Sequence, residues 1–388
     1  MRSRTVLLRF AALLVGAVVV LTGCGARPGG AATPSSAPGP VRAGAGVGVG
    51  KPAHAASDSG SLPRIAVLAT GGTIAGKANA NSAVGYTAGQ ATAEDLIKAV
   101  PGIDKVATLS AEQIANIGSQ DMNDQVWVKL ANRINELFAE GKVDGVVVTH
   151  GTDTIEETAF FLDNVVSSDR PVVLVGSMRP ATALSADGPA NLRSAVQVAA
   201  APSARGRGTM VVLNDTLHSA DDVTKTNTTS VQTFKSPNTG PLGYVDAAAV
   251  NFVQPVPQRR HSHFPVPSAP LPRVDIVYSH SNMTADPVKE ALSHGAKGLV
   301  LAGVGDGNTA KPVLDALSKA AKSGVVVVRS SRVGSGETVR NAEVDDDRLG
   351  TSAAHFLNPA KSRVLVQLLQ ANGITDPAKV QEEFTTRY

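Results

Sequence analysis

The amino-acid sequence predicts an α/β protein in which a larger N-terminal domain is built on a mostly parallel sheet flanked by helices. Three observations lead to this expectation. Uniformly apolar stretches of strand length alternate with stretches of helical spacing, and such strands need cover on both faces. A proline-rich segment without periodicity, 253–272, interrupts the alternation and is expected to be an interdomain linker. The alternation then resumes, so a smaller C-terminal α/β domain is expected over 273–388.

The N-terminal domain is expected over 63–252. Its strands are expected within the apolar stretches 64–76, 106–117, 143–151, 171–177 and 209–215. Its helices are expected at 93–100, 124–140, 188–199 and from Asp153 onward, where the stretch 153–157 supplies N-cap chemistry and first-turn acids. Val126, Leu130 and Ile134 recur at helical spacing, so Trp127 beside them is expected to pack on the sheet. Asn214–Asp215 and 224–227 are assigned to a polar loop.

The smaller domain repeats the pattern with shorter elements. Strands are expected at 274–279, 298–304 and 324–330, and helices at 287–294 and 311–323. The linker before it carries Arg259, Arg260, His261 and His263, but no third ligand stands at a spacing suited to a metal, so no metal site is expected.

The N-terminus predicts export. Residues 1–23 combine a basic start with an apolar run too short for a typical membrane span, as in a secretory signal peptide. They end before Cys24, and Leu21-Thr22-Gly23-Cys24 resembles a bacterial lipobox, in which the cysteine is lipidated and anchors the protein to a membrane. The segment 24–62 is dominated by Ala, Gly, Pro and Ser, which predicts a flexible tether.

Charge and cysteine usage exclude further classes. The signal peptide holds three arginines and no acid, which accounts for the whole formal charge of +3, so bulk charge predicts no nucleic-acid binding. Cys24 is the only cysteine, so the folded part can form no disulfide.

Hydroxyl and charged residues stand at the ends of the expected strands. The first strand stops at Thr70-Gly71-Gly72-Thr73, the third is followed by Thr152 and Asp153, and Lys225 follows the fifth. Ligands of open parallel sheets bind outside the carboxyl ends of the strands, so these residues can converge. A threonine nucleophile needs a neighbouring base or cation, which a partly buried lysine can supply. Taken singly, each residue is better explained as a cap, a turn hydroxyl or an exposed charge.

Six separated segments closely resemble bacterial type II L-asparaginases and occur in the same order. They are Ala69–Gly76 (ATGGTIAG), Asn116–Asp124 (NIGSQDMND), Thr149–Thr158 (THGTDTIEET), Asp222–Thr229 (DVTKTNTT), Gly303–Asn308 (GVGDGN), and Arg329–Val333 with Ala342–Asp346 (RSSRV, AEVDD). The resemblance implies the two-domain fold of that family, including a left-handed crossover in the N-terminal domain. It also implies hydrolysis of L-asparagine to L-aspartate and ammonia without metal or organic cofactor.

Catalytic roles follow from the resemblance position by position. Thr73 corresponds to the nucleophile, and Tyr86 to a tyrosine that assists it from a lid; the loop 77–90 that holds Tyr86 is equally well a plain surface loop on its own sequence. Thr152, Asp153 and Lys225 correspond to a second cluster, in which the lysine assists proton transfer.

Substrate-binding roles follow in the same way. Ser119 and Gln120 correspond to residues that hold the α-carboxylate, while Asp153 also binds the α-ammonium group. Asn308 and Glu343 correspond to residues that a neighbouring protomer contributes, so a tetramer built as a dimer of dimers is implied.

Some features depart from the family or leave alternatives open. Ser177 stands where some relatives have alanine, and Asp306 replaces an asparagine beside Asn308; the disulfide of some members cannot form. A broader glutaminase-asparaginase activity remains an alternative, because the substrates differ by one methylene. An amino-acid-binding lipoprotein of a transporter would share the lipobox, tether and two domains. A nucleotide site at Gly303–Gly307 is disfavoured, because the dinucleotide fingerprint is incomplete.

Overall fold

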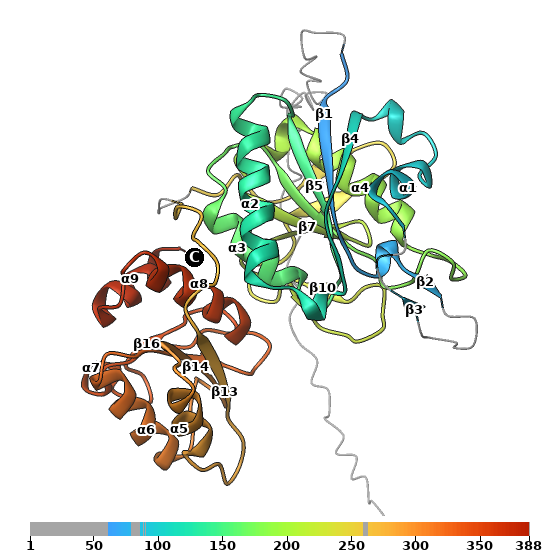
Figure 1. Cartoon of the computed structure of the whole chain (residues 1–388). Coiled ribbons are helices and arrows are strands. Elements are labelled where there is room, and N and C mark those ends of the chain that lie inside the picture. Colours follow the sequence, from blue (N-terminus) through green and yellow to red (C-terminus); the bar gives the residue numbers. More distant parts are fainter. Residues whose placement is uncertain (1–60, 79–85, 88, 90, 259–262, 388) are drawn as a thin grey trace, which may run out of the picture. The chain divides into compact units, whose positions relative to one another are not determined.

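The computed structural model describes residues 61–387 apart from 79–85, 88, 90 and 259–262 (Figure 1). The predicted signal peptide, Cys24 and nearly all of the tether lie outside the described residues. Among the helices of the described chain, none combines the length and the apolar character that crossing a membrane requires.

In the described part of the N-terminal domain, eight strands form one sheet in the order β12-β11-β8-β7-β6-β5-β1-β4. The strands are β1 Arg64–Gly71, β4 Thr108–Ile117, β5 Gly145–Thr149, β6 Val172–Val175, β7 Thr209–Leu213, β8 Thr216–Ser219, β11 Gly243–Val245 and β12 Val250–Phe252. Neighbours from β4 to β7 run parallel, as predicted. The strands β8, β11 and β12 add an antiparallel edge that the sequence analysis did not assign.

A tight hairpin starts this antiparallel edge. Leu213 pairs with Thr216, and the two residues between them, Asn214 and Asp215, have positive φ of 49° and 57°. Asn and Asp tolerate this left-handed conformation, which suits a two-residue turn between twisted strands. The prediction of a polar loop over 224–227 was wrong in part, because Thr224–Lys225 forms the short strand β9, which pairs with β10 Phe234–Lys235.

Helices cover both faces of the N-terminal sheet. They are α1 Ala93–Lys98, α2 Asp124–Ala139, α3 Ile155–Val165 and α4 Gly188–Ala200. Side chains alternate along β1, so that Ala66 and Leu68 share a core with α2 and α3, whereas Ile65 and Val67 share the opposite core with α1 and α4. Figure 1 shows α2 and α3 on one side of the strands and α1 and α4 on the other.

One crossover has the opposite hand to the others. β5, β6 and β7 are successive parallel neighbours, yet α3 connects the first pair over one face and α4 connects the second pair over the other. The crossovers through α1 and α2 have the same hand as that through α3. Since such connections are right-handed in about 98% of cases, the crossover through α4 is the left-handed one that the family resemblance implies.

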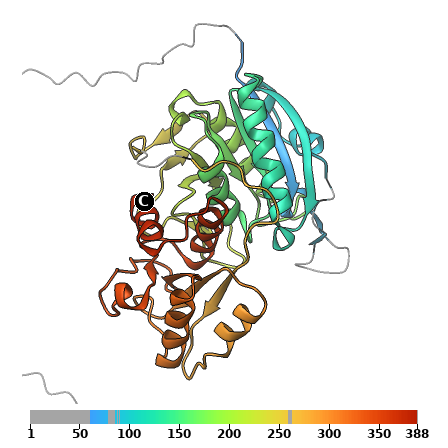
Figure 2. The same ribbon diagram turned by 60° about the vertical axis from the view of Figure 1, so that its left-hand side comes forward.

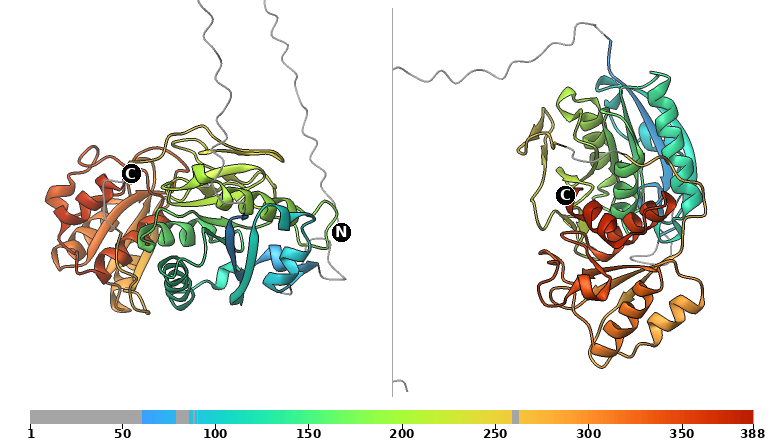
Figure 3. Two further views of the ribbon diagram at one scale, coloured as in Figure 1. Left: turned by 90° about the horizontal axis from the view of Figure 1, so that it is seen from above. Right: turned by 90° about the vertical axis from the view of Figure 1, so that its left-hand side faces the viewer.

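The described C-terminal domain contains a parallel sheet in the order β13-β14-β15-β16. Its strands are β13 Val274–Tyr278, β14 Gly298–Gly303, β15 Val326–Ser331 and β16 Ser352–Ala353. Its helices are α5 Asp286–Ser293, α6 Lys311–Lys322, α7 Asp346–Leu349, α8 Pro359–Ala371 and α9 Pro377–Thr386. α5 and α6 cover one face of the sheet (Figure 3).

Helix α8 joins the two domains. It packs on β13 and β14 and also against α3, and the red C-terminal helices lie between the two domains in Figure 2. One continuous apolar core therefore includes residues of both domains. Because the helix is covered on more than one side, even its polar residues Lys361 and Gln367 are 2% exposed. The position of α8 therefore makes Lys361 a buried charge at the junction of the domains.

Candidate active site

The turn after β1 is built of glycines that cannot be replaced without displacing neighbours. Gly71 and Gly72 have φ of 110° and 83°, a region that favours glycine. A Cβ on Gly71 would lie 2.3 Å from the carbonyl oxygen of Ile117, and one on Gly72 would lie 2.3 Å from the nitrogen of Gly151. The turn carrying Thr73 therefore packs backbone against backbone on the turn that follows β5.

The two threonines of this turn are both buried but differ in their places. Thr70 closes β1, and its hydroxyl donates to the carbonyl oxygen of Thr149 at 2.9 Å. Thr73 opens a short 3-10 turn, Thr73–Ala75, and is 5% exposed. The bond made by Thr70 ties β1 to β5, which is a structural function. Thr73, the predicted nucleophile, lies buried at the start of the turn that follows.

His150, directly after β5, anchors the next part of the site. Because a carbonyl oxygen only accepts, Nδ1 of His150 carries the proton in its 2.7 Å bond to Gly151 O. Nε2 then accepts from Thr158 Oγ1 at 2.9 Å, and that oxygen accepts from Trp127 Nε1 at 2.8 Å. Complete burial lowers the pKa of His150 from 6.5 to about 4, so the ring is neutral at neutral pH.

Ser119 links the turn after β4 to the turn after β5. It lies in the 3-10 turn Ser119–Asp121, and its hydroxyl accepts from the backbone N–H of Asp153 at 3.1 Å. Thr154 Oγ1 donates to Ser119 O at 2.7 Å. Helix α3 starts within the predicted stretch 153–157, with Thr154 as its N-cap and Glu156 and Glu157 in its first turn. The predicted capping bond is absent, because no side chain caps the helix and the Thr154 hydroxyl is directed to Ser119.

Gln120 lies next to Ser119 but makes a looser contact. Its Nε2 lies 3.3 Å from Asp121 Oδ2, and its side chain covers Gly118, where a Cβ would come within 2.4 Å of it. The residue is exposed, so its amide is accessible to a ligand at this edge of the sheet.

Lys225 reaches the turn after β5 from the short strand β9. Its Nζ donates to Thr152 Oγ1 at 2.9 Å and to Asp153 Oδ1 at 2.6 Å. The lysine side chain is 18% exposed and the aspartate side chain 55% exposed, so the pair is open to solvent on the aspartate side. Because the ammonium group uses the Thr152 oxygen as an acceptor, the Thr152 proton is left to point elsewhere, and the cation stabilises negative charge on that oxygen.

Two predicted site residues lie apart from this cluster. Asn308 Nδ2 donates to Glu343 Oε2, and both residues belong to loops of the C-terminal domain. Within the described residues, no hydrogen bond connects either of them to Thr152, Asp153 or Lys225. For Tyr86 the backbone alone is described: it lies in β3 Tyr86–Thr87, which pairs with β2 Lys77–Ala78.

A buried ion pair holds the Asn308 and Glu343 loops together. Arg329 and Asp346 are 1% and 0% exposed and bond at 2.7 Å. Arg329 Nη1 donates to the carbonyl oxygens of Asp306 and Gly307, directly before Asn308, and its Nη2 donates to Val339 O. Asp306 Oδ1 accepts from Val339 N at 2.7 Å, so the carboxylate of Asp306 also holds these two loops together.

His150, Arg329 and Asp346 were not predicted as site residues, although each stands inside a motif quoted above. His150 directly follows the apolar strand β5 and Arg329 is a charged residue within the apolar strand β15, which were the available signals; Asp346 opens α7 and carried no such signal. Among the described residues, no group of three or more His, Cys, Asp or Glu side chains is arranged to hold a metal ion.

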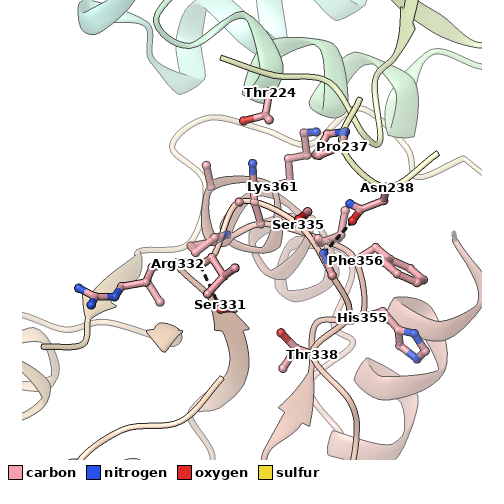
Figure 4. A pocket seen from close by; sticks show the side chains of 18 of the residues that line it. Thr224, Pro237, Asn238, Ser331, Arg332, Ser335, Thr338, His355, Phe356 and Lys361 are labelled. Atoms are coloured by element: carbon pink, nitrogen blue, oxygen red, sulfur yellow. Dashed lines mark hydrogen bonds between the residues drawn. The ribbon is translucent and has the colours of Figure 1, made fainter. Parts of the chain in front are cut away.

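A cavity of about 360 Å³ lies next to the strand that carries Lys225, and Thr224, Arg332 and Lys361 are among the residues that line it (Figure 4). Its lining does not include Thr73, Thr152 or Lys225.

Comparison with known proteins adds sequence similarity along almost the whole described chain. Residues 64–258 match the family described as "Asparaginase, N-terminal", and residues 273–384 match the "Glutaminase/Asparaginase C-terminal domain". The chain is 50% identical over 328 residues to "L-asparaginase 2" of Escherichia coli, covering 84% of this chain and 93% of that protein. It is likewise 50% identical over 332 residues to "Probable L-asparaginase periplasmic" of Haemophilus influenzae, covering 84% and 94%. A "Glutaminase-asparaginase" of Pseudomonas fluorescens is 42% identical over 313 residues, covering 79% and 86%.

Proposed function

Because the chain belongs to the asparaginase family, we propose that it hydrolyses L-asparagine to L-aspartate and ammonia. The observation that carries the proposal is the pair of bonds from Lys225 Nζ to Thr152 Oγ1 and Asp153 Oδ1, beside the buried turn of Thr73. A hydroxyl that accepts a hydrogen bond from a lysine, close to a second buried hydroxyl, is an arrangement suited to acyl transfer at an amide.

The proposed reaction proceeds in two steps. Thr73 Oγ attacks the side-chain amide carbon, its proton passes to the amide nitrogen, and the C–N bond breaks to release ammonia and leave an ester on Thr73. Water then attacks the ester, releases aspartate and restores the hydroxyl. Thr152 and Lys225 serve the proton transfers, since Lys225 holds the Thr152 oxygen as its acceptor. Backbone N–H groups of the glycine turn are the candidate donors to the developing oxyanion.

The side chains at these strand ends suit a zwitterionic substrate. The hydroxyl of Ser119 and the amide of Gln120 are suited to an α-carboxylate, and the exposed carboxylate of Asp153 is suited to an α-ammonium group. Tyr86 on the segment after the turn is proposed to assist Thr73.

Substitutions of Thr73 and Thr152 test which hydroxyl is the nucleophile, and a substitution of Lys225 tests its part in proton transfer. Thr73→Ala should lower kcat at least about 1000-fold while the fold is retained, because no covalent intermediate can form. Lys225→Met should lower kcat by about 100- to 10,000-fold, the usual range for general acid-base groups. In Thr152→Ala the ester should accumulate and be found on the peptide containing Thr73 by mass spectrometry. A labelled Thr152 in Thr73→Ala would reverse the two roles.

We also propose that the active site is completed by a second protomer in a tetramer. Asn308 and Glu343 hydrogen-bond to each other and not to the catalytic cluster within the described residues. The C-terminal domain also exposes large apolar side chains, with Ile276, Tyr278 and Phe356 at 40%, 60% and 45% exposure. Exposed apolar groups of this kind are suited to burial against another copy.

Mixing inactive variants tests this assembly. Thr73→Ala and Asn308→Ala should each be inactive alone, whereas dissociation and reassociation of a mixture should restore part of the activity. Active sites that pair the intact Thr73 of one variant with the intact Asn308 of the other would explain the recovery. An active monomer by light scattering at assay concentration would refute the shared site.

Preference for asparagine over glutamine is the narrower question. The asparaginase relatives quoted are 50% identical and the glutaminase-asparaginase relative 42% identical, which favours asparagine as the main substrate. One methylene is worth only about 1 to 3 kcal/mol in a pocket. The ratio of kcat/KM for the two amides decides between the readings.

We propose that the protein is exported and lipid-anchored through Cys24. The lipobox-like end of the signal peptide supports this, and a relative is named periplasmic. Cys24→Ser should release the protein from the membrane fraction or block its processing, and unchanged attachment would refute lipidation there. An amino-acid-binding lipoprotein of a transporter, the rival reading, would bind asparagine stoichiometrically without releasing ammonia.

A further inference from the structure

Lys361 is a buried lysine directly behind the segment that carries Lys225. It projects from α8 toward the strand of Thr224 (Figure 4) and is 2% exposed. Its Nζ donates to the backbone carbonyl oxygens of Asp221 at 2.7 Å and Val223 at 2.6 Å. These acceptors stand four and two residues before Lys225.

Burying a lysine amine costs free energy unless the group is hydrogen-bonded and near opposite charge. Desolvation lowers its pKa, while the carboxylates of Glu156, Asp221 and Asp222 act in the opposite direction. Glu156 lies in the first turn of α3, directly after the turn of Thr152 and Asp153, and no described group donates to its buried Oε2. The buried ammonium group is therefore near the backbone of one catalytic segment and the helix start of the other.

The segment that carries Lys225 has little regular structure of its own. β9 is two residues long and pairs with β10 alone, through Thr224 and Lys225. On its N-terminal side the segment is held by Asp222, whose carboxylate accepts from the backbone N–H groups of Asn238 and Thr239. The two bonds from Lys361 attach this segment to α8, a long, buried helix that is packed in the core shared by both domains.

We propose that Lys361 is a positioning residue for the reaction: it fixes the backbone before β9, so that Lys225 Nζ reaches Thr152 and Asp153. The proposal rests on the function proposed above for Lys225. Lys361 makes no bond to Thr152 or Asp153 in the described structure, and both of its donated bonds go to the segment before Lys225, so we expect its effect on turnover to pass through Lys225.

A double-mutant cycle tests the route of the effect. Lys361→Met keeps the length and apolar stem of the side chain and removes both donated bonds. It should lower kcat by about 10- to 100-fold, the scale expected when a catalytic group is misplaced by about 1 Å, with a smaller change in KM. In the Lys225→Met background the same substitution should change kcat less than about twofold, because there is no lysine left to position.

The matched control is Arg363→Met on the same helix. Arg363 donates to Val274 O and lies 3.7 Å from Glu157, so it also touches the domain junction but not the segment before Lys225. It should leave kcat within about twofold of the parent enzyme. If Lys361→Met does not fold, Lys361→Gln, which retains one N–H donor, takes its place in the cycle and is read in the same way.

The outcomes separate this proposal from the proposed function. An equal loss of kcat from the Lys361 substitution in both backgrounds would show a general structural effect and overturn the positioning function. A single Lys361 variant with unchanged kcat would overturn it as well. A fully active Lys225→Met enzyme would instead overturn the assignment of Lys225, and that result appears in the single variant before the cycle is completed.

Discussion

Two buried histidines should make the fold lose stability between pH 6.5 and pH 4. Burial lowers the pKa of both His150 and His218 from 6.5 to about 4. In His150 a second proton on Nε2 would face Thr158 Oγ1, an oxygen that already accepts from Trp127. In His218, Nδ1 bonds to Ser236 Oγ at 2.9 Å, and Nε2 is buried with no partner in the described chain.

The sign and size follow from the two pKa values. Since the folded pKa lies below the unfolded one, the unfolded chain takes up the proton first as the pH falls. The stabilisation is complete above about pH 6.5 and is lost progressively down to pH 4. Each histidine then accounts for about 3 kcal/mol over this range, with a limiting slope of ~1.4 kcal/mol per pH unit.

The assay is urea denaturation between pH 7.5 and pH 4.5 at a fixed protein concentration, because assembly also stabilises the fold. His218→Asn keeps a polar atom near the Nδ1 position and cannot titrate, so its stability curve should fall less steeply by the contribution of one histidine. His150→Asn should behave alike but start from a lower stability, since it loses the bond to Thr158. Parallel pH curves for the parent protein and His218→Asn would refute the reasoning.

Three further substitutions, with Gly141→Ala as a control for the first, probe the turn, the C-terminal loops and the serine after β6. Gly72→Ala should lower the free energy of unfolding by at least about 2 kcal/mol and abolish turnover, because its Cβ would clash with Gly151. Gly141 has a φ of 63°, and a Cβ there would have no atom within 4 Å, so Gly141→Ala should lower it by only about 1 kcal/mol. Thermal unfolding measures both. Arg329→Met leaves the buried carboxylate of Asp346 without its cation and should cost about 3 to 5 kcal/mol in urea denaturation; a loss under 1 kcal/mol would contradict the pair's function. Ser177→Ala removes a bond of 2.8 Å to Arg179 O and should cost about 1 kcal/mol, while the asparagine-to-glutamine ratio of kcat/KM changes less than about threefold. A larger change in that ratio would show that the Ser177 hydroxyl faces the substrate.

The parallel part of the fold was accessible from the sequence because its signals are local. Long apolar runs predicted β1, β5, β6 and β7, and helical spacing predicted α2. Its Trp127 is a core residue, as expected, but it stacks on helix α3, where its ring centroid lies 5.0 Å from that of Phe161. The antiparallel edge was missed because β8, β11 and β12 are short and depend on pairing with distant residues. α8 was not predicted, because neighbours cover it on several sides and its sequence therefore has no continuous polar face.

The site could be predicted as a set of residues but not as an arrangement. Motifs identified Thr152, Asp153 and Lys225, yet the bonds among them depend on where β9 lies relative to β5, which no local pattern encodes. Lys361 was beyond the reach of sequence reasoning for a similar reason. A lysine in a helix predicts an exposed charge, and its burial here results from contact between two domains.

The reversed crossover through α4 has a consequence for where a ligand can enter. Connections from adjacent strands that leave toward opposite faces open a crevice between the strand ends, and such a divergence occurs between β1 and β5 and again between β5 and β6. The turn of Thr152 is thus bordered by Gly72 on one side and by Gly176 on the other, where a Cβ would lie 3.1 Å from Thr152 Cγ2. Grafting these strand ends onto a sheet of uniform handedness would close one of the two crevices, so a redesign of this site must preserve the rare connection along with the residues.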